Sequence, residues 1–378
     1  MTGEAFILAA KRLPQGRYGG SLRGLGAVRL GESALRGLLA DPSLPAPSQV
    51  FWGLARSHNC GMNPARSVAL GAGLPVHSLA TTINMACGSS LQGLIFACLA
   101  LRDRMQGPFV VGGSEAMSDT PFLLPGLRWG YRMGHRDVPD VMHQDGLRCP
   151  ITGLLMGETI ERLAAKRGIT RAEADAYAAE SHTRAAAQDL CAEFTPIDEL
   201  HTDECIRPGC GMNELQKLPP VFDPAGQVTA GNASALSDGA AALLLATTGH
   251  LDDAKPIARI LGWAEAGVEP MDMGEAPVPA VRTLLARHGL CSADIDLWEL
   301  NEAFAAQVLV CARQLDLPMD RLNVAGGGIS RGHPIGASGA RILVTLIHLL
   351  QRRGGGLGVA TLGIGGGLGQ AVLVEVYA

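Results

Sequence analysis

The sequence predicts an α/β protein with two similar layered halves and a loop-rich domain inserted between them. A loop, a buried helix, a strand and a glycine turn occur in this order from Cys87 to Ser114, and again from His333 to Gly367. Apolar strand-like runs alternate with helical patterns, which favours mixed or parallel sheets covered by helices. Prolines gather between the two repeats, over residues 117–236, where the composition departs from that of the repeated units.

The size and composition are those of a folded chain with several subdomains. A chain of 378 residues exceeds what one hydrophobic core usually organises. Hydrophobic residues make up 47% of it and charged residues 18%, so the chain is not of the disordered class. The net charge of −5 gives no reason to expect nucleic-acid binding. Any anionic ligand must therefore be met by local basic residues.

Location and metal content are also constrained by the sequence. We see no secretory signal at the start and no apolar run long enough to span a bilayer, so no membrane partner is expected. The nine cysteines are scattered, which is typical of reduced thiols in the cytoplasm. His201, Cys205 and Cys210 match no tight zinc spacing, and we expect no metal.

The first repeated unit contains most of the N-terminal elements. Apolar runs predict strands at Phe6–Ala9 and Val50–Gly53, with a helix over 30–39 between them. The segment Cys87–Arg104 begins with small residues, becomes apolar and ends in charge, which predicts a buried helix. The run Phe109–Ser114 then predicts a strand that enters a glycine turn.

The second unit follows the same order. A helix is expected from His333 to Arg353, then a strand at Gly358–Leu362 and a last strand at Ala371–Val376. The intervening region contains a long polar helix over Thr170–Gln188, and loops of its length usually carry a binding function. We therefore divide the chain into an N-terminal half, a loop domain and a C-terminal half, over residues 1–117, 118–236 and 237–378.

Cys87 is the first candidate for chemistry. It follows a short apolar run and precedes Gly88 at the start of a helix, where free N–H groups and the helix dipole favour a thiolate. The glycine also lets a substrate approach the backbone closely. From position alone, however, a small buried thiol is the commoner role.

Two further polar segments could complete such a site. A thiol nucleophile needs a base, and an acyl-thioester reaction needs donors for the developing oxyanion. His333 stands between a glycine and a proline that fix its loop and expose its ring. Asn301 and Glu302 follow the strand-like run at 297–300, where polar residues commonly cap a helix.

Taken together, three segments resemble the motifs of the thiolase family: Asn84–Ser90 (NMACGSS), Asn301–Ala305 (NEAFA) and Gly332–Gly339 (GHPIGASG). The resemblance covers nearly the whole chain. Thiolases are coenzyme A-dependent enzymes that make or cleave the carbon–carbon bond of a 3-oxoacyl thioester. Membership implies the thiolase fold with duplicated αβαβα halves, coenzyme A and acyl-CoA as substrates, no permanently bound cofactor, and a homodimer or homotetramer.

The resemblance also implies roles for particular residues. Cys87 would be the acylated nucleophile, and His333 would draw its proton and donate a hydrogen bond to a thioester oxygen. Asn301 would hold a water that completes this oxyanion site, and the N–H of Gly365 would lie opposite that of Cys87. Arg331 stands where a small apolar residue is expected, so we expect a more positive field around His333.

Coenzyme A contacts follow from the same resemblance. The nucleotide would meet a basic side chain and an apolar face in the loop domain. The pantetheine arm would run beside the segment that returns from this domain, and apolar residues would wall the acyl pocket. These positions are Arg207 and Phe222 for the nucleotide, Ser234, Ala230 and Leu236 for the arm, and Leu147, Met156 and Phe304 for the pocket.

The chain departs from the family pattern at Gly363, where a second cysteine is expected as acid/base. Leu155 stands in place of a histidine, and Glu214 in place of a small polar residue. The site is therefore predicted to form an acyl-cysteine and to be altered in the following step. The first hypothesis is a C-acyltransferase. Its alternatives are an O- or N-acyltransferase or thioester hydrolase, and a non-catalytic acyl-CoA-binding subunit.

Overall fold

The computed structural model describes residues 4–103, 107–251 and 254–378. Within them, the strands form one continuous hydrogen-bonded path, and a short strand β2 (Gly16–Arg17) pairs with β6. The order along the path is β4 (Leu79–Ile83), β3 (Gln49–Gly53), β5 (Phe109–Ala116), β6 (Ser237–Ala246), β1 (Ala5–Arg12), β7 (Ala258–Gly267), β10 (Leu368–Val376), β9 (Gly356–Ile364) and β8 (Leu297–Leu300).

Each half of the path combines parallel and antiparallel pairs in the same way. In the first half β3 runs parallel to β4 and β5, and β6 runs antiparallel to β5 and β1. In the second half β8 and β9 are parallel, and β10 is antiparallel to β9 and β7. Only three residue pairs join β1 to β7, where the halves meet. The predicted duplication is confirmed.

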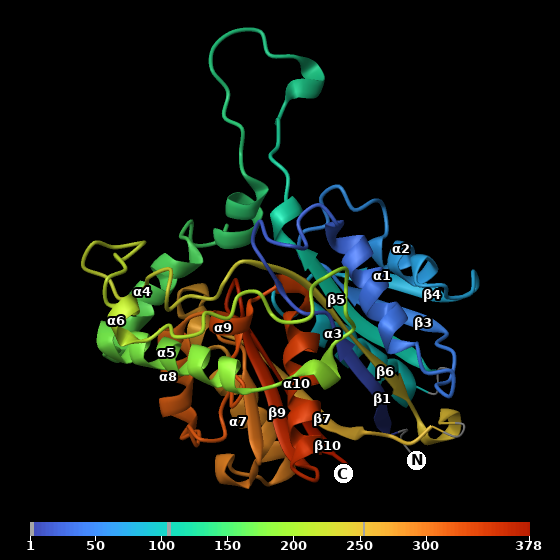
Figure 1. The fold of residues 1–378 in the computed structure, drawn as a ribbon. Coiled ribbons are helices and arrows are strands. Elements are labelled where there is room, and N and C mark those ends of the chain that lie inside the picture. Colours follow the sequence, from blue (N-terminus) through green and yellow to red (C-terminus); the bar gives the residue numbers. More distant parts are fainter. Residues whose placement is uncertain (1–3, 104–106, 252–253) are drawn as a thin grey trace.

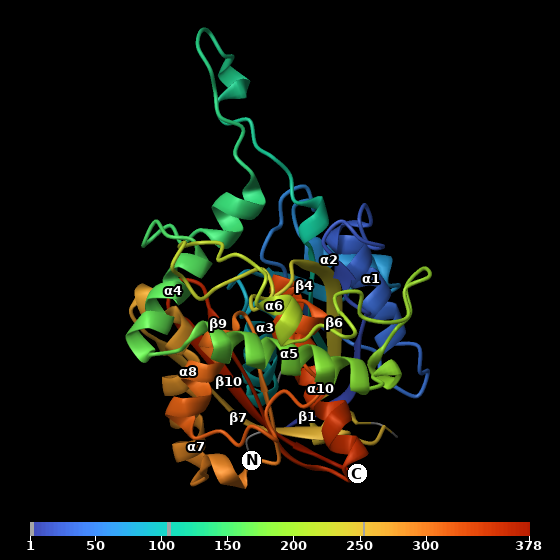
Figure 2. The same ribbon diagram turned by 60° about the vertical axis from the view of Figure 1, so that its left-hand side comes forward.

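Helices form layers on both sides of these strands (Figures 1 and 2). The helices α3 (Ser89–Arg102) and α10 (Ser338–Arg352) pack against each other, α3 on strands of the first half and α10 on strands of both halves. On the outer faces, α1 (Gly26–Leu38) and α2 (Pro64–Gly71) cover the first half. The second half is covered by α7 (Pro277–His288) and α8 (Ala305–Leu315).

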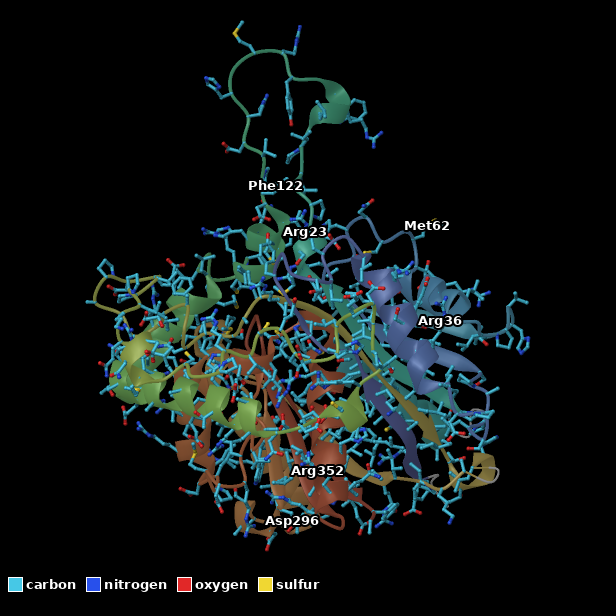
Figure 3. The ribbon with its side chains drawn as sticks, in the orientation of Figure 1. Arg23, Arg36, Met62, Phe122, Asp296 and Arg352 are labelled. Atoms are coloured by element: carbon cyan, nitrogen blue, oxygen red, sulfur yellow. The ribbon has the colours of Figure 1, made fainter. Side chains whose placement is uncertain are left out.

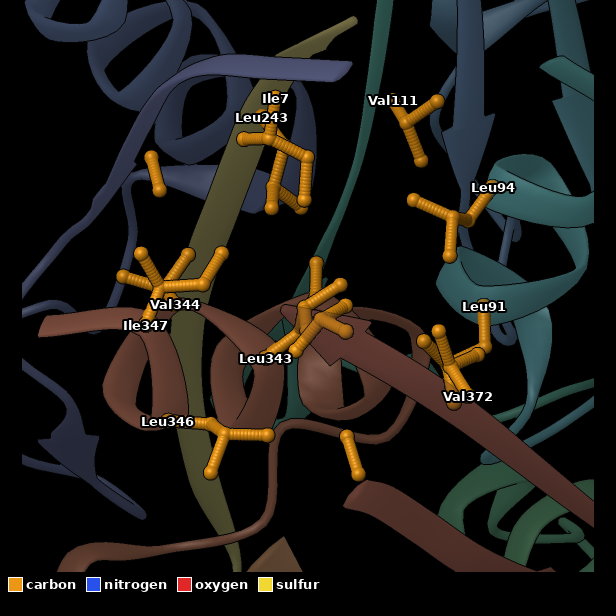
Figure 4. Packing of buried hydrophobic residues seen from close by; sticks show 14 of the residues in the cluster. Ile7, Leu91, Leu94, Val111, Leu243, Leu343, Val344, Leu346, Ile347 and Val372 are labelled. Carbon is orange, nitrogen blue, oxygen red and sulfur yellow. The ribbon is translucent and has the colours of Figure 1, made fainter. Parts of the chain in front are cut away.

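The central core explains why α10 sits between the two halves. Leu343 and Leu346 of this helix belong to one buried cluster with Leu91 and Leu94 of α3 and with strand residues such as Val372 (Figure 4). The apolar side chains of α10, from Ile342 to Leu350, are all buried, so the helix is enclosed on nearly all sides. Each such side chain stabilises the fold by about 1.5–3 kcal/mol when it is fully buried. The core therefore fixes the start of α10, which carries part of the site.

The loop domain lies over the ends of the strands. Its helices are α4 (Met156–Arg167), α5 (Arg171–Ala187) and α6 (Met212–Leu215), and α9 (Gly328–Arg331) contacts α5 from the second half. The predicted polar helix is α5, and the Thr170 hydroxyl caps it by accepting from the N–H of Glu173. A long loop over 119–140 projects away from the body, with Phe122 near its base (Figure 3).

Short helical turns complete the described chain. They are η1 (Met117–Asp119), η2 (Leu127–Trp129), η3 (His143–Leu147), η4 (Cys191–Glu193), η5 (Thr248–His250), η6 (Pro270–Glu275), η7 (Ser292–Asp294) and η8 (Ile335–Ala337). None of the helices in the described ranges combines the length and apolarity needed to cross a bilayer.

Two details differ from the sequence expectations. Residues 237–246, expected to open the C-terminal half, form β6 and pair with β5 and β1 of the first half. The reason is that the chain returns from the loop domain into the sheet it left, which local patterns cannot reveal. Arg104, expected to end the buried helix, lies outside the described residues, and α3 ends at Arg102.

Candidate active site

The carboxyl ends of parallel strands bring the candidate residues together, as they do in other open α/β sheets. In the first half, Arg56 follows β3, Cys87 follows β4, and Glu115 lies at the end of β5. In the second half, Asn301 follows β8 and Gly363 lies at the end of β9. Between the halves is an open cavity of about 150 Å³, lined in part by Arg56, Cys87, His333 and Gly363. The volume of this cavity is about ten times the space that one water molecule needs.

The turn that presents Cys87 is strained and braced. Ala86 has a φ of 45°, in the left-handed region that non-glycine residues rarely adopt. The Ser89 hydroxyl accepts a hydrogen bond from the N–H of Met85 (2.9 Å) and donates one to the carbonyl of Ala86 (2.6 Å). These bonds hold the half-buried Cys87 at the cavity wall immediately before α3.

Burial raises the pKa of the Cys87 thiol to about 11. The charge of Arg56 and the N–H groups of Gly365 and of Cys87 itself oppose this shift, while Glu115 adds to it. The expectation that the helix start favours a thiolate therefore needs correction, because loss of hydration outweighs the favourable dipoles here. At neutral pH the sulfur carries its proton, so its reaction requires a base.

His333 is an oriented and neutral imidazole, as a base for this thiol must be. Its ring is 7% exposed, and burial, together with the charges of Arg341 and Arg56, lowers its pKa to about 3. The ring Nδ1 lies 2.5 Å from the hydroxyl of Ser338, which donates its own proton to the carbonyl of Pro334 at 2.9 Å. Because the hydroxyl then accepts from Nδ1–H, Nε2 of the neutral imidazole is left as the nitrogen that can accept a proton.

Asn301 lies next to this ring. Its amide Nδ2 is 3.5 Å from both imidazole nitrogens, and its backbone N–H donates to the carbonyl of Thr361 (3.0 Å) on β9. The side-chain oxygen of Asn301 is buried and has no hydrogen-bond partner among the described residues. Such an oxygen can accept from a bound water or a substrate group.

Glu302 holds several segments around Asn301. Its fully buried carboxylate accepts from the hydroxyls of Tyr177 and Ser181, each at 2.8 Å, and from the N–H of Ile329 at 3.1 Å. These partners come from α5 and α9, so Glu302 ties the loop domain to the end of β8. This placement lets Glu302 orient its neighbour Asn301.

Glu115 joins segments of the two halves through hydrogen bonds to its carboxylate. Its buried carboxylate accepts from the N–H groups of Ala55 (3.2 Å), Arg56 (3.0 Å) and Gly336 (2.8 Å). Gly336 belongs to the loop of His333, so Glu115 links that loop to the segment after β3. Burial raises the pKa of Glu115, and Arg56 and the three N–H groups act against that rise.

The glycines at the end of β9 complete the cavity wall. Gly363 and Gly365 both line the cavity. A Cβ atom at Gly363 would lie 3.1 Å from the carbonyl oxygen of Met273 and 3.4 Å from Cδ of Pro277, so a side chain fits after a small shift. The Gly365 N–H acts on the Cys87 sulfur, consistent with the expected position opposite it.

The residues expected to contact coenzyme A divide into three groups. Four of them line the cavity with Cys87, namely Leu147, Met156, Ser234 and Phe304. Two lie directly behind its wall: Phe222 packs with Met156 over Gly157, and Leu236 packs with Leu147 and Cys87. The remaining two, Ala230 and Arg207, are exposed and do not line the cavity.

Arg331 does not make the field around His333 more positive, contrary to the expectation. Its guanidinium is buried, lies 2.6 Å from the Asp203 carboxylate and donates to the carbonyls of Ala325 and Ala185. The neighbouring carboxylate compensates its charge, and the basic residues that shift the pKa of His333 are Arg341 and Arg56.

The other two departures from the expected pattern have local roles. The N–H of Leu155, just before α4, donates to the Glu158 carboxylate (2.6 Å), and Leu155 is not part of the cavity wall. The Glu214 carboxylate accepts from the N–H of Gly211 (3.1 Å) and caps α6.

Sequence reasoning missed Arg56. This side chain is 5% exposed and lines the cavity beside Cys87, and its charge lowers the pKa of both Cys87 and His333. A signal was present, because an arginine directly after the apolar run of β3 stands where ligands bind in open sheets. Its burial depends on Gly146, whose missing side chain makes room for the guanidinium.

The layered halves, the cavity lined by Cys87 and His333, and the buried Asn301 beside the His333 ring are typical of the acyl-transferring class. Two family descriptions match the sequence, thiolase N-terminal domain over residues 5–249 and thiolase C-terminal domain over residues 254–376. The chain belongs to the thiolase family, and it is an acyltransferase.

Individual relatives agree with this assignment. Acetyl-CoA acetyltransferase of Chromobacterium violaceum is 44% identical over 389 residues, covering 98% of this chain and 99% of that protein. The human mitochondrial 3-ketoacyl-CoA thiolase is 39% identical over 391 residues, covering 98% of each. Among solved structures, acetyl-CoA acetyltransferase of Bacillus anthracis superposes with a TM-score of 0.95 at 38% identity over 99% of both chains. Human mitochondrial 3-ketoacyl-CoA thiolase in complex with CoA superposes with a TM-score of 0.95 at 38% identity, over 100% of this chain and 99% of that one.

Proposed function

We propose that this protein takes an acyl group from acyl-CoA onto Cys87 and transfers it to a carbon nucleophile or to coenzyme A. The observation that carries the proposal is that Cys87 and a neutral, oriented His333 line one cavity. The relatives are named acetyl-CoA acetyltransferase and 3-ketoacyl-CoA thiolase, and these names support coenzyme A thioesters as the substrates. No permanently bound cofactor is required for these steps.

The placement of Cys87 and His333 in one cavity wall supports the following first half-reaction. Nε2 of His333 takes the proton from Cys87, and the sulfur attacks the thioester carbonyl carbon. The oxyanion that develops is met by N–H groups such as those of Cys87 and Gly365. When the carbon–sulfur bond to coenzyme A breaks, His333 returns the proton to the leaving sulfur. The acyl group then remains as a thioester on Cys87.

The second half-reaction depends on Gly363. In a thiolase with a cysteine at this position, the thiol would take the α-proton of the acceptor or activate the incoming coenzyme A. Glycine does neither, and a general acid/base contributes roughly two to four powers of ten in rate. We infer that acylation of Cys87 is intact and that ordinary thiolysis and Claisen condensation are slow. Asn301 and His333 would hold a water or the acceptor oxygen in this step.

The absence of a proton acceptor at Gly363 also favours a second candidate function. Transfer to an alcohol, an amine or water needs no α-proton to be removed. In that case the protein is an O- or N-acyltransferase or a thioester hydrolase.

One experiment separates these candidates. The protein is incubated with acetyl-, butyryl- and acetoacetyl-CoA, the Cys87 peptide is examined by mass spectrometry, and the released product is identified with coenzyme A, an amine or water as acceptor. Rapid coenzyme A-dependent loss of acetoacetyl-CoA would contradict an altered second step. Binding of acyl-CoA with no adduct on Cys87 would instead indicate a non-catalytic acyl-CoA-binding subunit.

We further propose a cytoplasmic homodimer or homotetramer in which the first halves pair. Strand β4 lies at the end of the strand order, and the exposed Leu79 opens it. The projecting loop also carries several exposed apolar side chains: Phe122, Leu124, Leu127, Trp129, Met133 and Val138. Light scattering of the purified protein tests this, and a monomer would contradict it.

A further inference from the structure

Among the buried arginines of the described residues, Arg56 is the one with neither a side-chain hydrogen bond nor a carboxylate within 4.0 Å. Its side chain is 5% exposed, and no hydrogen-bond partner among the described residues meets Nε, Nη1 or Nη2. The other buried arginines in these ranges each have a carboxylate within 4.0 Å: Arg12 and Arg331 share Asp203, and Arg341 faces Glu299. Buried charges are normally paired, so the guanidinium of Arg56 lacks a partner that its setting requires.

The acidic groups nearest to Arg56 are engaged elsewhere. The Glu115 carboxylate accepts three backbone N–H groups, including that of Arg56 itself, and does not contact the guanidinium. Asp145, which also lines the cavity, lies 3.5 Å from the imidazole of His58. The guanidinium therefore has donors left, and Arg56 is one of the residues that line the cavity with Cys87.

We propose that Arg56 binds a carboxylate on the acyl chain of the substrate, so that the preferred substrates are CoA thioesters of dicarboxylic acids. A guanidinium presents a planar fork of N–H donors that matches a carboxylate in geometry and charge. The rest of the cavity wall is mostly apolar, with Leu147, Met156 and Ile160 to accommodate the methylenes between the thioester and the carboxylate.

This inference rests on the proposed function, because it names the substrate class of the same site. The acyl-transfer step itself is unchanged. The sulfur of Cys87 bonds to the thioester carbon, the bond from that carbon to the coenzyme A sulfur breaks, and His333 carries the proton from one sulfur to the other. The distal carboxylate stays ionised on Arg56 throughout and takes no part in bond making.

The test compares substrates of matched length that differ in charge. Succinyl-CoA and glutaryl-CoA are compared with butyryl-CoA and valeryl-CoA, and malonyl-CoA shows whether a shorter distance is accepted. The rate of adduct formation on Cys87 is measured by mass spectrometry at several substrate concentrations. In the parent protein we expect the carboxylated substrates to react about 10- to 100-fold faster at low concentration, mainly through a lower half-saturating concentration.

Substitutions then assign the preference to Arg56. In R56M the ratio of carboxylated to neutral rates should fall to about one or below, and in R56K, which keeps the charge without the fork, it should be intermediate. Arg128→Met, on the projecting loop, removes an exposed positive charge and should leave the ratio as it is in the parent. Circular dichroism checks that each variant is folded. If R56M does not fold, R56K and the substrate series still test whether Arg56 causes the preference for carboxylated substrates.

The outcomes distinguish a failure of the proposed function from a failure of the proposed role of Arg56. No adduct from any acyl-CoA would overturn the proposed function. Adducts from neutral and carboxylated substrates at equal rates would overturn the role of Arg56 alone. A parallel loss with every substrate in R56M would also overturn it, since Arg56 would then act on Cys87 or on coenzyme A itself.

Discussion

The imidazole of His333 and the hydroxyl of Ser338 are joined by a 2.5 Å hydrogen bond that orients the ring for proton transfer. Ser338 is the first residue of α10, whose apolar body is fixed in the central core. The hydroxyl gives its own proton to Pro334, so the ring keeps its proton on Nδ1. The packing of a buried helix thereby sets the tautomer of the proposed base.

This arrangement predicts that acylation of Cys87 is nearly independent of pH. The pKa of His333 is lowered to about 3 and that of Cys87 is raised to about 11, so neither group titrates in between. The single-turnover rate with butyryl-CoA should therefore stay within about twofold between about pH 5 and about pH 9.

A fall in this rate with a midpoint near about pH 6.5, the ordinary value for histidine, would contradict it. Stability is checked by circular dichroism at each pH. Because the folded-state pKa of His333 is lowered, the unfolded chain binds the proton first, and this ring disfavours folding increasingly as the pH falls below about 6.5.

Cys87→Ala should abolish the covalent adduct with acyl-CoA while the fold is retained. The matched control is Cys291→Ala, since Cys291 is also a free cysteine but is exposed on the surface. Intact-protein mass spectrometry after incubation with acetyl-CoA measures the effect. An adduct that persists in Cys87→Ala would remove the basis for the assignment.

Iodoacetamide labelling alone is not a sufficient probe of Cys87. Cys191 and Cys291 are exposed and open to the reagent, whereas burial raises the pKa of the Cys87 thiol to about 11. The informative result is protection. Acyl-CoA should block labelling of the Cys87 peptide and leave the peptides of Cys191 and Cys291 unaffected.

Much of the fold could be predicted because its signals are local. Apolar runs and glycine turns marked β3, β5, β9 and β10, and the small-to-apolar pattern marked α3. The strand β6 was assigned to the wrong half, since its pairing with β5 joins residues more than a hundred positions apart. No local pattern carries that information.

In the candidate site, too, local motifs reveal some residues and long-range contacts determine the others. Cys87, His333 and Asn301 could be found because each stands in a distinctive motif. The structure places Cys87 and His333 in the wall of one cavity and Asn301 beside the His333 ring. Arg331 was misread because the carboxylate that compensates it, Asp203, is 128 positions away. Arg56 was missed because its burial is produced by the approach of Gly146 from the loop domain.

Asp203→Asn should destabilise the protein strongly. The carboxylate of Asp203 accepts from Arg12 (2.7 and 3.0 Å) and from Arg331 (2.6 Å), and all three side chains are buried. Removing its charge leaves two buried guanidinium groups short of a partner, which costs about 3–5 kcal/mol. Urea unfolding measures this free energy.

Glu180→Gln is the matched control, because its pair with Arg184 lies at the surface and is worth less than about 1 kcal/mol. The charges of Arg12 and Arg331 hold the pKa of Asp203 well below its usual range against the effect of burial. Its contribution is therefore present above about pH 4 and is lost as the pH falls further. Equal losses in the two variants would contradict the argument.

Gly363→Cys is expected to supply the acid/base group that, under the proposed function, this site lacks. The position lines the cavity with Cys87, and its Cβ would lie 3.1 Å from the Met273 carbonyl, so the backbone must move by only a few tenths of an ångström. A thiol there could take an α-proton or activate coenzyme A. We predict a gain of about 10²- to 10⁴-fold in acetoacetyl-CoA thiolysis, without a matching change in Cys87 acylation.

Gly363→Ala separates the thiol from its steric effect. Alanine meets the same contacts with Met273 and Pro277 but carries no titratable group, so thiolysis should remain at the level of the parent. The two half-reactions are measured separately, acylation by mass spectrometry and thiolysis by the loss of acetoacetyl-CoA absorbance. If both substitutions leave thiolysis unchanged while acylation continues, the parent already uses another base, or its pocket is shaped for an acceptor that needs none. The O- or N-acyl transfer and hydrolysis candidates would then be favoured, since they require no α-proton transfer.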